Sequence, residues 1–144
     1  MSTFLTYEGT TDFIAVTPAL IVTLTASGSI TAGRAVTYDT SNPSAVYQPS
    51  AIRSGSLPVA GVALTTAADG KAVSVMVWGF AKSLPTLPST GATGIIGQPL
   101  VITGSGYWGA SGSGRNYCTA GKIVSGSAGF TYAFIDCVSN TSVT

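Results

Sequence analysis

The sequence contains no histidine and very little charge of either sign. Its 144 residues include six Lys or Arg and five Asp or Glu, for a formal net charge of +1 at pH 7. Acid–base and nucleophilic catalysis would therefore depend on these few groups, the two cysteines and the tyrosines. Asp39 and Asp69 stand in sequences typical of turns, and Asp136, beside Cys137, ends an apolar stretch. We expect that the chain is not an enzyme.

The same scarcity argues against cofactors, metals and nucleic acids. Ligand spacings such as CxxC or DxDxDG are absent from the sequence. The glycine-rich stretch GSGYWGASGSGR at residues 104–115 lacks the strand and helix that flank a nucleotide-binding loop. A chain without a basic run also lacks the positive surface that phosphate backbones attract. We expect no cofactor, no metal and no nucleic-acid partner.

Long hydrophobic runs are missing as well. The longest apolar run near the N-terminus covers residues 19–24 and is interrupted by Thr23, whereas about 20 residues are needed to span a bilayer. The first residues, MSTFLTYEGTTDF, lack the basic start of a secretion signal, so we expect no membrane partner and synthesis in the cytoplasm. In that reducing compartment Cys118 and Cys137, the only cysteines, are expected as buried thiols. The sequence leaves the alternative of a disulfide between them open.

What the sequence does contain is a period of two. Apolar residues alternate over residues 59–64 and over residues 73–78, and Asp69-Gly70 between them is typical of a tight turn. These stretches predict a β-hairpin. Further short alternating stretches fill the chain, and Gly, Ser, Asn and Pro at residues 41–44 and 125–127 predict turns. The sequence predicts an all-β fold, a small β-sandwich or barrel.

The chain divides into an extended N-terminal arm, residues 1–17, and a β domain, residues 18–144. Within the domain we expect a first half at 18–82, a Pro/Gly-rich linker at 83–99 and a second half at 100–144. Three of the seven prolines lie in the sequence LPTLPSTGATGIIGQP at residues 84–99, which is incompatible with a helix or a central strand.

The two halves of the domain resemble each other. Four stretches align in chain order: GRAVTYD (33–39) with GQPLVIT (97–103), VYQPSA (46–51) with YWGASG (107–112), AGVALTT (60–66) with AGKIVSG (120–126), and VSVMV (73–77) with FTYAF (130–134). Alternating strands with glycine turns also align by chance. If the repeat is real, two small β-layers would bury each other's apolar faces.

Several large apolar side chains are candidates for contacts with another chain. In the arm these are Phe4, Leu5, Tyr7, Phe13 and Ile14. An arm of this kind either forms an edge strand on its own sheet or docks on another chain. In the domain the candidates are Trp78, Tyr107 and Trp108, which fit a core or a subunit interface, or, for Tyr107 and Trp108, a platform that stacks on sugars.

The order AGRAVTYD (32–39), GVAL (61–64), the turn AADG (67–70) and VSVMVWG (73–79) resembles the decoration, or head cement, proteins of tailed phages. This resemblance implies a small β domain, commonly in trimers, on the outer surface of the capsid. It implies the major capsid protein as partner and stabilisation of the head as function. The protein would then be a virion component made in the host cytoplasm. The alternative hypothesis is a carbohydrate-binding or adhesin-like β-sandwich on a virion or cell surface.

Overall fold

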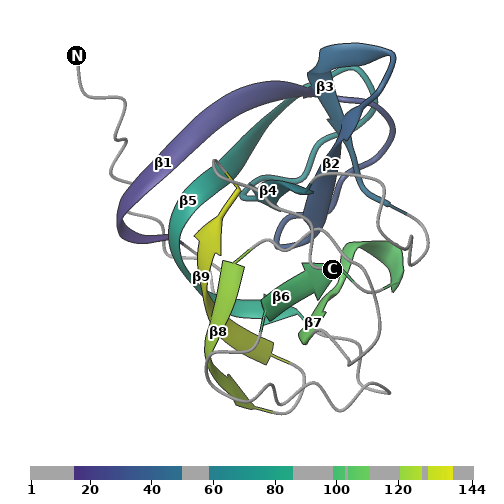
Figure 1. Cartoon of the computed structure of the whole chain (residues 1–144). Helices are drawn as coiled ribbons and strands as arrows, with labels where there is room; N and C mark the ends of the chain where they lie inside the picture. The colour runs from purple at the N-terminus through teal and green to yellow at the C-terminus, as the bar shows by residue number, and fades with distance from the viewer. Residues whose placement is uncertain are drawn as a thin grey trace.

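The computed structural model describes residues 15–49, 59–85, 99–102, 104–110, 121–127 and 130–137, most of them in β-strands (Figure 1). Within these ranges no helix is long and apolar enough to cross a membrane. The prediction of an all-β fold is confirmed. The elements are β1 (Ala15–Ala26), β2 (Ala35–Asp39), β3 (Asn42–Tyr47), β4 (Val59–Ala63), β5 (Ala72–Pro85), β6 (Pro99–Ile102), the 3-10 turn η2 (Gly104–Gly106), β7 (Trp108–Ala110), β8 (Gly121–Ser127) and β9 (Phe130–Asp136).

The first five strands, here called the first unit, close into a barrel. β1 pairs in parallel with β3, and the ladder continues antiparallel through β2, β4 and β5, which returns to β1. The predicted hairpin at residues 59–78 is confirmed as the β4–β5 pair. All five strands contribute to one cluster of small apolar side chains, as a narrow barrel requires. We call this cluster the barrel core; its buried members are Ala26, Ile30, Val36, Val46, Ala60, Ala63, Ala67, Val73, Val75 and Val77.

The remaining strands repeat the pairing of the first unit. From β5 the sheet continues through β9, β8, β6 and β7, so the order β5-β4-β2-β3 recurs as β9-β8-β6-β7. The C-terminal part of β5, residues 78–85, pairs with β9 as β1 pairs with β5. β5 is therefore both the last strand of the first unit and the first strand of a second unit, residues 78–85 with β6–β9. The two β-halves expected from the sequence thus share one strand order.

The ladder registers define which residues of the two units correspond. Val62 lies opposite Met76 in the first unit, and Lys122 lies opposite Phe134 in the second. Met76 therefore corresponds to Phe134. The sequence alignments of 33–39 with 97–103 and of 60–66 with 120–126 agree with the pairing of these strands in the two units. The other two alignments are wrong by one residue: position 46 corresponds to 108, and position 73 to 131.

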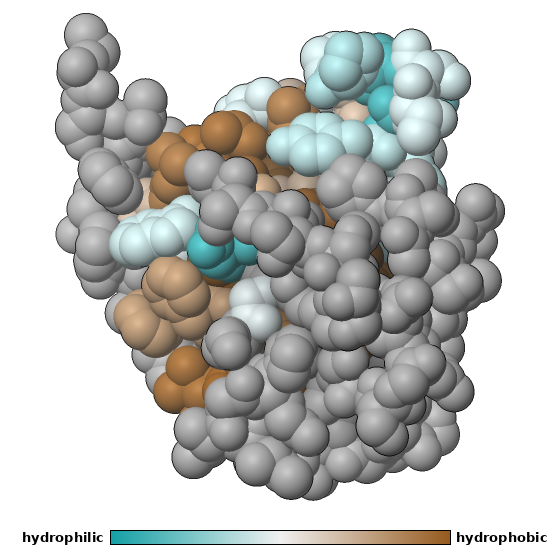
Figure 2. Space-filling view, viewed as in Figure 1, coloured by the Kyte–Doolittle hydropathy of each residue, from teal (hydrophilic) through white to brown (hydrophobic). Residues whose placement is uncertain are grey.

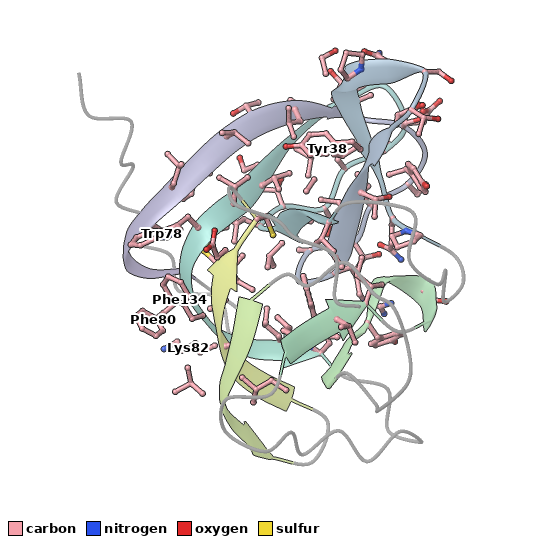
Figure 3. All side chains as sticks on the ribbon, viewed as in Figure 1. Tyr38, Trp78, Phe80, Lys82 and Phe134 are labelled. Atoms are coloured by element: carbon pink, nitrogen blue, oxygen red, sulfur yellow. The ribbon has the colours of Figure 1, made fainter. Side chains whose placement is uncertain are left out.

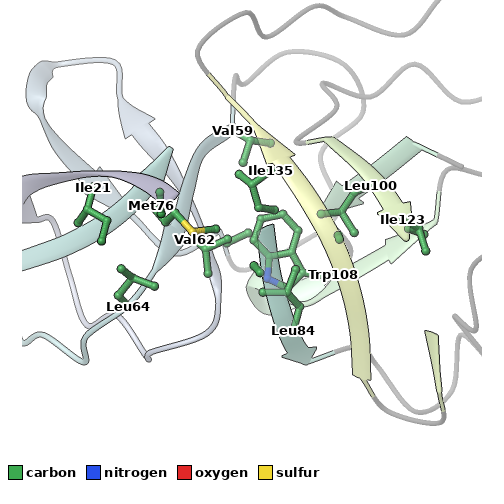
Figure 4. Close-up of a cluster of buried hydrophobic side chains, with 14 residues drawn as sticks. Ile21, Val59, Val62, Leu64, Met76, Leu84, Leu100, Trp108, Ile123 and Ile135 are labelled. Carbon is green, nitrogen blue, oxygen red and sulfur yellow. The ribbon is translucent and has the colours of Figure 1, made fainter. Parts of the chain in front are cut away.

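A second cluster, the inter-unit core, lies between the two units (Figure 4). Each buried residue that the second unit contributes is the counterpart of a barrel-core member or of a residue packed against that core. The first unit contributes the residues on the outside of its barrel. The outer face of the first unit thus covers the inner face of the second unit. The first-unit members are Ala19, Ile21, Ala35, Val59, Val62, Leu64 and Met76; the second-unit members are Ala81, Leu84, Leu100, Trp108, Ile123, Ala133 and Ile135.

Strand β5 crosses the predicted boundary between the first half and the linker. Residues 83–85, expected in the linker, lie in β5, where Leu84 and Pro85 pair with β9. Pro85 ends β5 and Pro99 opens β6, positions at which the missing N–H is tolerated. Residues 86–98 of the predicted linker lie outside the described residues. At the N-terminus β1 begins at Ala15, so the last three residues expected for the arm belong to a strand.

Two predicted turns are wrong. Residues 42–44 belong to β3, because the reversal is completed at Thr40 and Ser41, where the Asp39 carboxylate accepts the Ser41 N–H at 2.9 Å. Residues 125–127 belong to β8 and pair with β9. In both places the turn-forming composition belongs to the exposed or terminal part of a strand, where glycine and serine are tolerated.

Candidate interaction surfaces

Trp108 opens β7 and lies in the inter-unit core with 0% of its surface exposed. Its indole Nε1–H donates to the carbonyl oxygen of Gly33 over 2.9 Å, which satisfies the one polar group of the side chain. It corresponds to Val46 of the barrel core. Of the positions expected for Trp108, the core is the one that the folded chain occupies.

Arg34 and Gln48 hold η2 against the first unit. Arg34 Nη1 and Gln48 Nε2 donate to the same carbonyl oxygen, that of Ser105, over 2.8 and 3.1 Å. Gln48 Oε1 accepts the backbone N–H of Thr31 at 2.9 Å, which orients the amide. Arg34 Cζ also lies 3.5 Å from the centroid of the Tyr107 ring, a cation–π contact. We call this group the η2 clasp.

The backbone of η2 is shaped for this close approach. Ser105 has left-handed backbone angles (φ 55°, ψ 34°), and Gly106 has φ 73°. A Cβ at Gly106 would lie 2.8 Å from Gln48 Cγ and 3.1 Å from the carbonyl oxygen of Ala35. Trp108 is buried, and the Arg34 guanidinium lies over the half-buried ring of Tyr107. Tyr107 and Trp108 therefore form a structural contact between the units rather than a flat sugar-binding platform.

Three aromatic side chains gather on the outer face of the second unit, the side opposite the inter-unit core. Phe134 of β9 lies between Trp78 and Phe80 of β5, at centroid distances of 5.3 and 5.0 Å and interplanar angles of 86° and 66°. Figure 3 shows them together on the outer side of the sheet, with Lys82 beside them. Phe80 is 39% exposed, above the exposure of every other large hydrophobic side chain that the structure describes. We call Trp78, Phe80 and Phe134 the aromatic ledge.

A β-bulge contributes to this arrangement. Between Leu20 and Ile21 of β1 the partner on β5 changes from Trp78 to Met76, so that Val77 is an extra residue. Met76 faces the inter-unit core and Val77 the barrel core, as adjacent residues of a strand do, and the bulge shifts the register of the residues that follow, beginning with Trp78. Sequence reasoning identified Trp78 as a candidate contact but missed Phe80 and Phe134. The available signal was the alternation of Trp78, Phe80 and Lys82 along one strand.

The arm candidates Phe4, Leu5, Tyr7, Phe13 and Ile14 lie outside the described residues. Where β1 begins, Ala15 pairs with Ala81, and the next pair includes Phe80 of the ledge. Strand β1 therefore begins beside the aromatic ledge. Residues 15–17 lie in β1, which pairs with β5 of the same chain.

Cys137 follows β9 and is half-buried against the inter-unit core. Burial of the thiol, and secondarily the charge of Asp136, raises the pKa of Cys137 from 9.0 to about 12. The thiol is therefore protonated at neutral pH and a poor nucleophile. Cys118 lies outside the described residues. Among the residues that are described, no three His, Cys, Asp or Glu side chains group as metal ligands.

Comparison with known proteins gives a likeness in fold. No protein-family model matches the chain, and no curated protein matches it by sequence. Among solved structures the chain is similar to the head fiber gp8.5 N base of bacteriophage phi29, with a TM-score of 0.53 and 15% sequence identity. The match covers 81% of this chain and 93% of that chain. The likeness thus extends over nearly the whole of the fiber base.

Proposed function

We propose that this chain is a structural protein of a tailed-phage virion that binds the major capsid protein lattice on the outer surface of the head and stabilises the shell. The observation that carries the proposal is the fold likeness to a head fiber base, a protein named for its place on a phage head. The sequence resemblance of residues 30–82 to capsid decoration proteins supports the same proposal.

The surface chemistry supports attachment through apolar and hydrogen-bonded contacts. With 11 charged residues in 144, the chain has few groups that could hold it to a shell by charge. We propose that it assembles as a homotrimer, because several chains that grip one lattice together turn weak contacts into tight attachment. The apolar arm residues Phe4, Leu5 and Tyr7 are proposed as contacts with the capsid.

The test is co-sedimentation of the purified chain with mature heads and with isolated capsid subunits. We expect binding to heads alone, with little release when salt rises from about 0.15 M, where the Debye length is ~8 Å, to 1 M. Decorated heads should melt at a higher temperature than bare heads, since a ligand of the intact shell stabilises it by mass action. Equal melting of bare and decorated heads would remove the stabilising role.

A matched pair of variants tests the arm. Replacing Phe4, Leu5 and Tyr7 by Ser should weaken sedimentation with heads and leave the chain's own melting curve in place. The control carries Ser at Thr3, Thr6 and Thr10, the same number of changes in the same segment without loss of apolar area. If both triple variants bind heads equally well, the arm is not a capsid contact.

The alternative of a carbohydrate-binding module has lost its proposed platform, because Trp108 is buried and Tyr107 stacks under Arg34. Glycan-array binding by the wild-type chain remains the direct measurement for that alternative.

A further inference from the structure

The aromatic ledge occupies a position that is buried elsewhere in the same molecule. Ile21 lies opposite Met76 where β1 pairs with β5. In the second unit, the counterpart pair is Phe80 opposite Phe134, where β5 pairs with β9. The repeat therefore places the ledge on the outer face of the second unit, at the positions that Ile21 and Met76 take on the outer face of the first.

In the first unit this outer pair is covered. Ile21 is 8% exposed and Met76 is 0% exposed, and both pack in the inter-unit core against inner residues of the second unit such as Ile135. The fold thus contains one example of a contact in which the outer face of one unit covers the inner face of the next.

Each chain also presents the two halves of that contact on its surface. The outer face of the second unit carries the ledge, with Phe80 39% exposed. The inner face of the first unit ends in a rim of half-buried apolar side chains that pack against the barrel core, and Figure 2 shows apolar residues gathered there, over β1 and β5. The rim consists of Leu20, Val22, Leu24 and Tyr38.

We propose that the aromatic ledge of one copy docks on the rim of a second copy and so repeats, between chains, the contact that joins the two units within a chain. The side chains fit a protein partner better than a sugar. Rings at 66° and 86° to one another present edges and faces in several directions, whereas a sugar ring stacks on one flat face.

The two surfaces differ, so the contact is head-to-tail. Such a contact generates a closed ring when the rotation between copies closes, and a filament when it does not. A ring occupies every ledge and every rim, which is compatible with the trimer proposed above. The inference rests on the internal repeat and not on attachment to a capsid, so each proposal can fail without the other.

The experiment uses the full-length chain in solution, without capsids, and measures mass by sedimentation velocity and light scattering. The wild type is expected to associate, and Phe80→Lys on the ledge is expected to reduce the mass to that of one chain. Leu24→Lys on the rim should do the same. Ala68→Lys, at an exposed position that belongs to neither the ledge nor the rim, is the matched control and should associate as the wild type does. Far-UV and near-UV circular dichroism identify any variant that fails to fold, in which case Phe80→Ser or Tyr38→Lys replaces it.

Mixing the two variants distinguishes a head-to-tail contact from a ledge-to-ledge contact. The ledge variant keeps an intact rim and the rim variant keeps an intact ledge, so an equimolar mixture should form a one-to-one complex through a single intact interface. A wild-type monomer, an associated Phe80→Lys variant, or a mixture of folded variants that stays monomeric would each overturn the proposal. Dissociation on removal of residues 2–12 alone would indicate that the N-terminal segment, and not the rim, is the partner of the ledge. That result would overturn the proposal too.

Discussion

Gly61 is a position at which one added methyl group should be strongly damaging. It lies in β4 with φ +157°, and a Cβ built there would overlap the main-chain carbonyl oxygen of Met76 on β5 and lie 2.8 Å from Val75 Cγ1. Neither strand can yield easily, because Val62 and Ala63 pair with Met76 and Val75 in the same ladder. The second unit has the same device, since a Cβ at Gly121 would overlap the carbonyl oxygen of Phe134.

The expected cost of Gly61→Ala combines two terms. Forcing a group into a packed core costs about 1–3 kcal/mol, and a backbone held in a sparsely populated region costs about 1–3 kcal/mol more. We therefore expect a loss of about 3–5 kcal/mol in the free energy of unfolding. For a chain near this size, that loss lowers the melting temperature by roughly 10 °C or more.

Gly70→Ala is the matched control. Gly70 also has a positive φ, +76°, but no atom lies within 4 Å of a Cβ built there. This variant carries only the left-handed backbone cost of about 1–2 kcal/mol, partly offset by a less flexible unfolded chain. Urea and thermal unfolding of both variants beside the wild type give the comparison. Melting of Gly61→Ala within about 2 °C of Gly70→Ala would refute the close approach of β4 to β5.

Three further predictions concern single buried groups. Trp108→Phe should lower the free energy of unfolding by about 2–4 kcal/mol, because it leaves a cavity and removes the donor to Gly33 O; an unchanged urea midpoint would show that this bond is absent. Thr37→Val should be neutral or stabilising by up to about 1 kcal/mol, because the buried Thr37 hydroxyl has no hydrogen-bond partner among the described residues; a large loss would reveal a partner. The pKa of Cys137 is about 12 in the folded chain against 9.0 ordinarily, so between these pH values the folded chain keeps a proton that the unfolded chain loses. The free energy of unfolding should therefore fall as pH rises above about 9, by up to ~1.4 kcal/mol per pH unit. Cys137→Ala should show a shallower fall, and equal slopes would contradict the burial of the thiol.

Local alternation was sufficient to predict the strands and the central hairpin, because the period of two is a property of each strand by itself. The closure of the barrel could not be predicted from local alternation. It depends on the parallel pairing of Thr25 and Ala26 with Ala45 and Val46, which joins segments that no local pattern connects. The same limit explains the one-residue errors in aligning the two halves. A bulge or an extra loop residue changes register without changing composition, and a shift of one residue exchanges the faces of a strand.

The candidate contacts were predictable as residue types but not as positions. Trp78 and Trp108 both lie in apolar, alternating sequence, yet one is part of an exposed ledge and the other is fully buried. The difference arises from the fold, because Trp108 takes the inward position of Val46 in the repeat while Trp78 follows a bulge. Arg34 and Gln48 carried no signal, since their function is to bind a carbonyl oxygen of a turn far along the chain.

Because one strand, β5, serves both units, the two units share backbone hydrogen bonds to the same strand and are expected to unfold together. The barrel cannot close during synthesis until residues 72–81 have emerged to pair with β1, more than 40 residues after β1 is complete. Once β5 is in place, it is already the template on which β9 adds the second unit. Unfolding should accordingly be cooperative, with one calorimetric transition and no stable half-molecule after proteolysis. A partner that binds only the second unit would then raise the melting temperature of the entire chain.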